Sequence, residues 1–374
     1  MIEGMDAVRR QYEQNPYPPL SQFAWPKPNQ GQSLRYEYGR AHLAAKSTPH
    51  VDHHAIRILI AGAGTFEPLV VAQMHPKAKE VVAVDWSSAS LRNLERRMLI
   101  NGWRAGFRSA VWSRRPGHVR LVQADLQEWD GEGGQFDYIL ATNVLHHFSD
   151  PAAMLARLAS WLAPGGMLRL VTYASHSRYW IGATARWLSM AGIHAQSPRL
   201  RYACRRAVQR LPSAHPVCSA FDSLRECEHR ASLIDAYFHA CDNPLPPLEW
   251  KRACDDCGLR LVGEGQDLFS RSSVLDTLVP RVQALSAWNK LQILDDLLEL
   301  CASPVLWLHK DPDFSPGPDD YDVWRGASVT RLSAASNRAD KMDARREDVL
   351  VAGHEIALAL DVEYQLPSQC YFDL

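Results

Sequence analysis

The sequence predicts an α/β protein with a mostly parallel sheet. Between about residues 55 and 173, short runs rich in β-branched residues alternate with segments of helical pattern. The short runs are apolar almost throughout, as strands buried on both faces of a sheet are. Repeated strand–helix–strand units form parallel sheets with right-handed crossovers. The expected strands are Ile56–Ala61, Val81–Asp85, Val119–Ala124, Phe136–Thr142 and Met167–Tyr173.

Two of the intervening helices have clear end signals. Ser87 is placed to cap one helix and Gly102 to end it. Asp150 and Pro151 are the N-cap and first residue of a second helix, and Gly165 lies beyond its end. Helical and strand patterns resume after residue 247, so we expect the sheet to be completed by late segments of the chain.

Composition excludes several classes of protein. The 374 residues include 41 Lys and Arg against 42 Asp and Glu, for a net charge of −1, which argues against binding nucleic acid by bulk electrostatics. No run of about 18 apolar residues lacks a charge, and the first residues do not resemble a signal peptide. The 8 cysteines are best interpreted as reduced thiols. We therefore expect a cytoplasmic protein without a membrane partner.

The first expected strand leads into a glycine turn, Gly62-Ala63-Gly64. The second strand ends in Asp85 and the third in Asp125, so both carboxylates lie at the carboxyl edge of the sheet, where open α/β sheets bind ligands. A carboxylate at the end of the second strand can accept both hydroxyls of a ribose. The alternative is that the glycines form an ordinary strand–helix turn and the aspartates are caps.

The residues after the turn bear on the type of nucleotide. Dinucleotide sites place a third glycine where this chain has Glu67, preceded by Phe66. A bulky side chain and a negative charge both oppose a pyrophosphate, which disfavours a dehydrogenase. A ligand with a ribose but no phosphates avoids both objections, and S-adenosylmethionine is such a ligand.

The motifs also resemble a known family, the class I S-adenosylmethionine-dependent methyltransferases. The similar segments are ILIAGAGTFEP (58–68), VVAVDWS (81–87), QADLQEW (123–129), FDYILATNVLHHFSDP (136–151) and LAPGGMLRLVTY (162–173). YEQNPYP (12–18) and DAYFHACDNPLP (235–246) are similar to a bacterial subgroup with an NPYP-containing N-terminal arm. The resemblance implies a Rossmann-like, mostly parallel seven-stranded sheet, with S-adenosylmethionine as methyl donor and S-adenosylhomocysteine as product.

The resemblance also implies the parts of the cofactor site. It places the methionine tail over the glycine turn, the ribose on Asp85, and the adenine against Trp86, Asp125 and Leu126. Ile60 and Phe66 depart from the family pattern, at positions where many members have an acidic residue and a glycine. The full set of expected cofactor-binding residues is Gly62, Ala63, Gly64, Glu67, Asp85, Trp86, Asp125, Leu126, Asn143 and Tyr12.

Five residues are candidates for catalysis. His146 and His147 follow the fourth strand, and an imidazole beside the methyl donor has a suitable pKa for a base, although this pair could simply pack the loop. Asp235 and His239 are spaced to share a hydrogen bond, or to form a helix-end salt bridge instead. Tyr17 could present a hydroxyl or serve in aromatic packing.

The resemblance and the composition together predict five segments. Residues 15–28 hold five prolines and several aromatic residues, as expected of a strap packed across another domain. The segments are an arm packing over the cofactor site (1–54), the cofactor-binding core (55–173), a mainly helical insertion walling the acceptor pocket (174–247), the end of the sheet (248–309), and a partly mobile C-terminal extension (310–374).

The sequence also contains candidate residues for a metal site and for an RNA-binding surface. Structural zinc sites usually combine two closely spaced cysteine pairs, and only one such pair, Cys254 and Cys257, is present, so no metal is expected. The other potential metal ligands are scattered, namely His50, His53, His54, Cys227, His229, His239 and Cys241. Arginines interleave with aromatic residues near Arg104–Arg120 and cluster near Arg199–Arg210. Such segments could contact RNA, although a solvated face or a contact with a partner is the favoured interpretation.

We expect methyl transfer to an O, N or S atom of a small molecule or peptide. An RNA methyltransferase and a non-catalytic cofactor-binding protein are the alternatives. The oligomeric state and the acceptor are left open.

Overall fold

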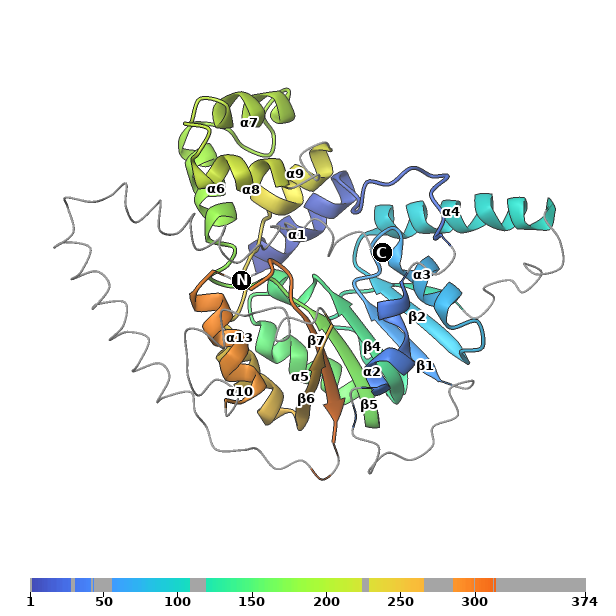
Figure 1. Ribbon diagram of the computed structural model, residues 1–374. Coiled ribbons are helices and arrows are strands. Elements are labelled where there is room, and N and C mark those ends of the chain that lie inside the picture. Colours follow the sequence, from blue (N-terminus) through green and yellow to red (C-terminus); the bar gives the residue numbers. More distant parts are fainter. Residues whose placement is uncertain are drawn as a thin grey trace.

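The computed structural model describes residues 2–27, 31–41, 43, 56–107, 119–223, 229–265, 285–298, 300–311 and 313. Seven strands form one sheet in the order β3-β2-β1-β4-β5-β7-β6 (Figure 1). The first five pair in parallel, and β7 is antiparallel to both β5 and β6. The strands are β1 (Arg57–Ala61), β2 (Glu80–Asp85), β3 (Val119–Gln123), β4 (Phe136–Thr142), β5 (Leu162–Val171), β6 (Leu259–Glu264) and β7 (Val305–Lys310).

The expected α/β class and mostly parallel sheet are therefore confirmed. The fifth strand differs from expectation because it begins at Leu162, directly after the preceding helix, rather than at Met167. Leu162 pairs with Phe136, and an irregularity in register separates this pair from the regular ladder that begins at Tyr138. The turn residues of this segment therefore belong to the strand, and Gly165 with its φ of 76° lies within it.

Helices cover both faces of the sheet, each over its own core. One core joins alternate residues of β1, β2 and β4 to three helices, α5 (Pro151–Trp161), α10 (Pro247–Asp256) and α13 (Ala287–Asp296). The other core lies beneath α2 (Tyr36–Ala41), α3 (Glu67–Met74) and the start of α4 (Ser88–Phe107). Strands covered on both sides explain why the sequence runs are apolar without alternation.

The predicted helix ends at Asp150 and Ser87 are correct, and the one at Gly102 is wrong. The Asp150 carboxylate accepts from the N–H of Ala153 at 2.9 Å, and the Ser87 hydroxyl accepts from the N–H of Ser90 at 3.1 Å, so both expected N-caps are confirmed. The prediction that Gly102 ends its helix is wrong, because α4 continues to Phe107. A glycine ends a helix by adopting positive φ, and Gly102 does not. Its cost within a helix is only about 1 kcal/mol.

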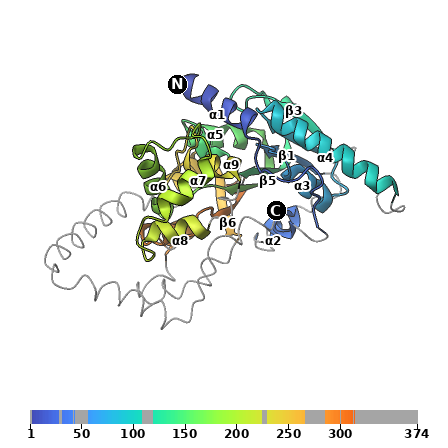
Figure 2. The same cartoon turned by 90° about the horizontal axis from the view of Figure 1, so that it is seen from above.

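Four helices form a separate lobe above the carboxyl edge of the sheet, which we call the cap. They are α6 (Tyr179–Met190), α7 (Leu200–Val208), α8 (Pro216–Ser223) and α9 (Arg230–Tyr237). They share a small core of their own that includes Leu188, Cys204 and Leu233. Seen from above, the cap gathers on one side of the sheet and α4 extends on the other (Figure 2). The cap lies in the segment expected to be a helical insertion.

The N-terminal arm crosses between the cap and α4. Its helix α1 (Ile2–Gln14) lies beside α9 in both views, and the proline-rich segment that follows runs to the first turn of α3 (Figures 1 and 2). The fully buried Arg97 of α4 fixes this segment. Its guanidinium donates to the carbonyls of Leu20 at 3.0 Å and Ser21 at 3.2 Å, and also to that of Thr65.

Several expectations concern residues outside the described ranges. These include nearly all of the 310–374 extension, the histidines at 50, 53 and 54, Cys227, and the arginines at 108, 114 and 115. Among the residues that are described, no helix is long and apolar enough to cross a membrane.

Candidate functional site

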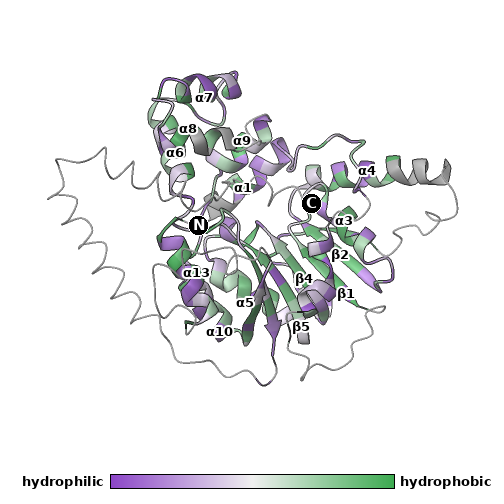
Figure 3. Ribbon diagram, viewed as in Figure 1, coloured by the Kyte–Doolittle hydropathy of each residue, from purple (hydrophilic) through white to green (hydrophobic). Residues whose placement is uncertain are grey.

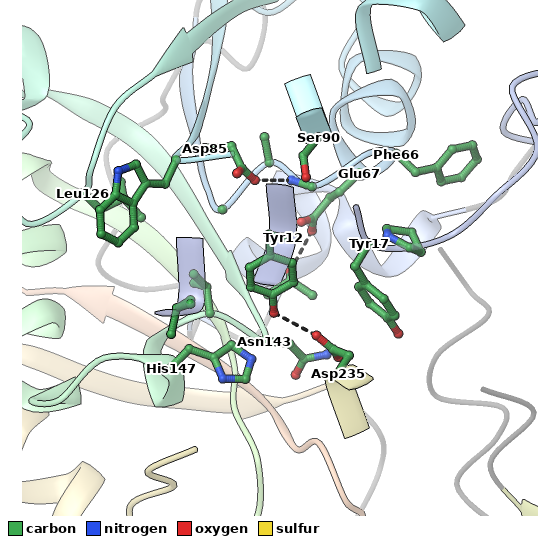
Figure 4. Close-up of a pocket in the computed structure, with 18 of the residues that line it drawn as sticks. Tyr12, Tyr17, Phe66, Glu67, Asp85, Ser90, Leu126, Asn143, His147 and Asp235 are labelled. Atoms are coloured by element: carbon green, nitrogen blue, oxygen red, sulfur yellow. Dashed lines mark hydrogen bonds between the residues drawn. The ribbon is translucent and has the colours of Figure 1, made fainter. Parts of the chain in front are cut away.

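A cavity of about 470 Å³ lies at the carboxyl edge of the sheet, beneath the cap (Figure 4). One side, which we call the strand-edge side, is formed by the residues that directly follow β1 to β4. The other side, which we call the cap side, is formed by α1, α9 and the later residues of the loop after β4, His147 and Phe148. Thirteen of the fifteen predicted site residues line it, and His146 and His239 do not. Those thirteen are Tyr12, Tyr17, Gly62, Ala63, Gly64, Glu67, Asp85, Trp86, Asp125, Leu126, Asn143, His147 and Asp235.

The glycine turn needs both of its glycines. Gly62 has a φ of 78°, and a Cβ there would lie 2.8 Å from Cγ2 of Val144. Gly64 has a φ of 55°, and a Cβ there would lie 3.0 Å from the carbonyl oxygen of Tyr17. Positive φ is costly for residues with a Cβ, so the turn is restricted by conformation and by space together. Its backbone is thus packed between the loop after β4 and the arm.

Asp85 organises the turn from the end of β2. Its carboxylate accepts from the N–H of Gly64 at 2.7 Å and from that of Ser87 at 2.8 Å (Figure 4). Desolvation raises the pKa of Asp85 to about 6, against the opposing effect of these two hydrogen bonds. A carboxylate has about four acceptor positions, so two remain for hydroxyl groups of a ligand in the cavity.

The end of β3 forms the wall next to Asp85. Asp125 turns back on its own loop, where it accepts from the N–H of Gln127 at 2.9 Å, and Leu126 is buried against the core. Trp86 and Ser90 complete this part of the cavity. The combination of apolar surface with one carboxylate suits a flat heterocycle with an exocyclic amine.

Glu67 and Asn143 lie near the turn. Buried Glu67 accepts from the Thr142 hydroxyl at 2.7 Å, and desolvation raises the pKa of Glu67. Asn143 has a φ of 53°, an uncommon conformation for a residue other than glycine, and its buried amide oxygen has no hydrogen-bond partner. Asn143 thus lines the cavity as a residue while its amide oxygen is shielded from it.

On the cap side, a tyrosine from the arm bridges two of the candidate residues. The Tyr12 hydroxyl donates to Asp235 Oδ1 at 2.8 Å (Figure 4). It also lies 3.1 Å from Nε2 of His239. The direct Asp235–His239 hydrogen bond considered from their spacing is therefore replaced by a link through Tyr12, because α9 ends at Tyr237. Desolvation raises the pKa of Asp235 to about 6 and lowers that of His239 to about 4.

The three histidines occupy different positions. His147 lines the cavity and stacks on His239, with ring centroids 3.6 Å apart. His146 is fully buried behind it, stacked on Tyr173, whose N–H donates to His146 Nδ1 at 3.1 Å. Burial lowers the pKa of both His146 and His147 well below the ordinary histidine value, so both rings are neutral at physiological pH. Only His147 is placed to contact a ligand directly.

Two overlapping sets of potential metal ligands occur here within the described part of the chain, both including His147. One adds His146 and Asp242, and the other adds Asp235 and His239. The ring planes of His147 and His239 differ by only 19°, so their in-plane lone pairs run side by side instead of converging on one point. The Tyr12 hydroxyl also lies between Asp235 and His239. This geometry favours hydrogen bonding over coordination.

Sequence reasoning missed the residues that hold the arm in place. Glu13, next to Tyr12, accepts from the N–H of Ser88 at 2.6 Å and that of Ala89 at 3.1 Å, so it caps α4 from another helix. The Tyr17 carbonyl accepts from the N–H of Thr65 at 3.1 Å. Each contact joins residues far apart in the sequence, so no local pattern indicates it. The other cavity-lining residues outside the predicted site are mostly apolar or small, namely Val8, Pro18, Pro19, Leu20, Phe66, Ser90, Ala124, Thr142, Val144, Phe148, His229 and Ser232.

Comparison with known proteins identifies the family. The family described as "Methyltransferase domain" matches residues 37–239, which is more than half of the chain. The chain belongs to the methyltransferase-domain family. Its strand order and the expected Rossmann-like sheet are those of the class I methyltransferase fold. Membership of the NPYP-containing subgroup stays a prediction.

Two of the sequence relatives of this chain are bacterial proteins. An uncharacterized protein of Synechococcus sp. is 28% identical over 302 residues, which cover 77% of this chain and 68% of the relative. An uncharacterized methyltransferase of Mycobacterium bovis is 28% identical over 120 residues, which cover 32% of this chain and 52% of that protein.

Among solved structures, PKMT2 from Rickettsia typhi in complex with AdoHcy has a TM-score of 0.61 at 15% identity. The similar part covers 82% of this chain and only 57% of the Rickettsia chain. At this identity the likeness shows the fold alone.

Proposed function

We propose that this protein is an S-adenosylmethionine-dependent methyltransferase that acts on an O, N or S atom of a small molecule or peptide. S-adenosylhomocysteine is then the second product. The observation that carries the proposal is a single cavity with two unlike sides. Its strand-edge side has a glycine turn with two strand-end carboxylates, and its cap side has a histidine and an aspartate.

The residues of the strand-edge side fit a cationic nucleoside without phosphates. Glu67 occupies the start of α3, where a pyrophosphate would need free N–H groups and no negative charge. The same buried carboxylate lines the cavity and suits the amino group of a methionine tail. Asp85 has acceptor capacity for ribose hydroxyls beside the turn.

When bound, the donor supplies an electrophilic methyl group on a sulfonium. The protein must then align the acceptor, exclude water and take up any proton the acceptor loses. The arm and the cap line the cavity on the side opposite the strands. Tyr17 and Tyr12 reach the cavity from the arm, and Ser232 from α9.

Asp235 is the best-placed proton acceptor. With a pKa of about 6, its carboxylate is ionised at neutral pH and still basic enough to take a proton from an acceptor group. His147 also faces the cavity, but burial lowers its pKa, so its role is to hold the acceptor by a hydrogen bond. His239 and Tyr12 position Asp235, and His146 supports the loop behind His147.

Calorimetry with S-adenosylhomocysteine tests the proposal. We expect the wild-type protein to bind it, Asp85→Ala to bind at least about tenfold more weakly because a ribose partner is lost, and Asp130→Ala to bind normally. Asp130 caps a short turn remote from the cavity and is the matched control. Equal binding by wild type and Asp85→Ala, or tighter binding of NAD⁺ than of S-adenosylhomocysteine, would overturn it.

A further inference from the structure

A buried arginine lies one side chain away from the cavity. Arg169 is a residue of β5 that is only 6% exposed, and it pairs in register with Leu140 of β4 and Trp307 of β7. The strands in this part of the sheet are mainly hydrophobic (Figure 3). The Arg169 guanidinium lies over the ring of Trp307, 6.0 Å from the ring centroid. A cation taken out of water at such a position is costly unless other groups stabilise it.

The hydrogen bonding of this guanidinium is incomplete. Within the described part of the chain, it makes one hydrogen bond, from Nη1 to the Thr142 hydroxyl oxygen at 3.3 Å, and its buried Nε has no partner. Unpaired buried donors cost free energy, and an apolar side chain of similar length would avoid that cost. The stability of the core therefore does not explain why an arginine occupies this position.

The Thr142 hydroxyl joins the arginine to a carboxylate of the cavity. It donates to Glu67 Oε1 at 2.7 Å, which leaves its lone pairs for the N–H of Arg169. Thr142 and Glu67 line the cavity, where Figure 4 shows Glu67, and Arg169 does not. Both hydrogen bonds of this chain, which we call the relay, point from the positive group toward the negative one. Hydrogen bonds aligned in this way polarise and strengthen one another in a desolvated site.

The positive charge of Arg169 acts on the ionisation of Glu67. Burial raises the pKa of Glu67, and the Thr142 hydrogen bond and the charge of Arg169 both oppose that rise. Glu67 is also in the first turn of α3, where the helix dipole favours a negative charge. Arg169 is therefore placed to keep Glu67 ionised, and an ionised Glu67 can bind a cationic group of a ligand in the cavity.

We propose that Arg169 is a positioning residue for the methyl donor. It acts through Thr142 and holds Glu67 as an ionised, fixed partner for the amino group of the methionine tail. The inference rests on the proposed function. It deepens that function because it assigns the discrimination between ligands with and without an amino acid tail to a residue that does not line the cavity.

Two ligands separate this role from a merely structural one. S-adenosylhomocysteine has the charged amino group, whereas 5′-methylthioadenosine has the thioether and nucleoside without the amino acid tail. By calorimetry, we expect Arg169→Met to bind S-adenosylhomocysteine at least about fivefold more weakly than wild type, and 5′-methylthioadenosine within about twofold of wild type. Retained binding of the second ligand also shows that the cavity of the variant is folded.

Arg57→Met is the matched control. Arg57 begins β1 at the opposite edge of the sheet, where it forms an ion pair with Glu80. Its loss removes an arginine from the same sheet without touching the relay. Both ligands should therefore bind this variant within about twofold of wild type.

A double-mutant cycle tests whether the arginine acts through Glu67. Glu67→Gln should itself weaken S-adenosylhomocysteine binding, and Arg169→Met should then add less than about a twofold loss, because no charge is left to hold. Thr142→Val breaks the relay with Arg169 in place, so it should also weaken S-adenosylhomocysteine and spare 5′-methylthioadenosine. Thr142→Ser retains the hydroxyl and should restore binding. This second pair decides the question if Arg169→Met does not fold.

Three results would overturn the proposal. They are equal weakening of the two ligands by Arg169→Met, an equal effect of Arg169→Met with and without Glu67→Gln, and wild-type affinity of Thr142→Val for S-adenosylhomocysteine. Any of them, in a protein whose wild type binds S-adenosylhomocysteine, contradicts the relay and leaves the proposed function standing. A wild-type protein that binds neither ligand would instead contradict the proposed function, and the role of the relay with it.

Discussion

The two sides of the cavity are built in different ways. The strand-edge side is made by consecutive strand ends, and Asp85 reaches back only to Gly64. The cap side joins Tyr12 of the first helix to Asp235 of α9, at a sequence separation of 223. One side is therefore set by the sheet itself, and the other exists only when arm, sheet and cap have assembled.

This difference suggests how one fold can serve many acceptors. The strand-edge side is fixed by backbone conformation and by carboxylates at strand ends, so it can change little without loss of the turn. The cap side depends on side chains carried by added segments, which can vary while the sheet stays the same. Substitutions confined to one side therefore separate the contributions of the two sides.

The largest effect is expected on the strand-edge side. Gly62→Ala should weaken S-adenosylhomocysteine binding by about 100-fold, because the added Cβ would lie 2.8 Å from Val144 and the turn must move. Gly133→Ala is the control, since Gly133 has a φ of 84° with nothing within 4 Å of its Cβ position. Both variants should lose about 1 kcal/mol of stability from positive φ, but only Gly62→Ala should lose affinity. Equal affinity losses would contradict the steric argument.

Asp235→Asn should stabilise the ligand-free protein at alkaline pH. The folded-state pKa of about 6 lies above the ordinary value of 3.8, so the stability contributed by this group is present below about 3.8 and lost as pH rises through 6. The variant should exceed wild type by about 1–3 kcal/mol in free energy of unfolding at pH 8, and the gain should shrink below pH 5. Urea unfolding at several pH values measures the difference in free energy of unfolding between the variant and wild type. A difference that does not depend on pH would exclude the buried charge as its cause.

Tyr12→Phe should destabilise the protein by about 1–2 kcal/mol, because buried Asp235 loses a hydrogen-bond donor and His239 loses its partner at Nε2. Tyr202→Phe, at an exposed tyrosine of the cap, should change stability by less than about 0.5 kcal/mol. Thermal unfolding of the two variants compares them directly. If the two variants lose the same stability, the hydrogen bonds of Tyr12 between the arm and the cap do not stabilise the protein.

The smallest effect concerns the attachment of the arm to α4. Glu13→Ala should cost about 1 kcal/mol, since the N–H groups of Ser88 and Ala89 lose their cap. Glu95→Ala removes an exposed carboxylate from the same helix α4 and should be near neutral. Chemical denaturation resolves this difference, and a larger cost for Glu95→Ala would contradict the capping role.

The sequence allowed the strand-edge side to be predicted more fully than the cap side. Asp85, Asp125 and the glycine turn follow apolar runs whose ends can be read locally, and parallel strands bring those ends together. Tyr12 and Asp235 were predicted individually, but their contact was not, because no periodicity specifies pairing across 223 residues. Local signals can also fail within a helix. Gly102 was expected to end α4, yet the helix continues through it to Phe107.

The buried position of His146 could not be read from the sequence either. His146 and His147 are adjacent in one short turn, yet one faces the cavity and the other packs on Tyr173. Which of two neighbouring side chains points inward depends on the rotation of that turn against β5 and the cap. Tertiary packing decides this.

A crystal structure with S-adenosylhomocysteine tests the division of the cavity most directly. We expect the nucleoside to lie along Asp85, Asp125 and Leu126, and the amino acid tail to lie over Gly62–Gly64 near Glu67 and Asn143. The Tyr12–Asp235 hydrogen bond should stay intact beside an open acceptor space. A ligand bound against Tyr12, His147 and Asp235 with the glycine turn left uncovered would contradict it.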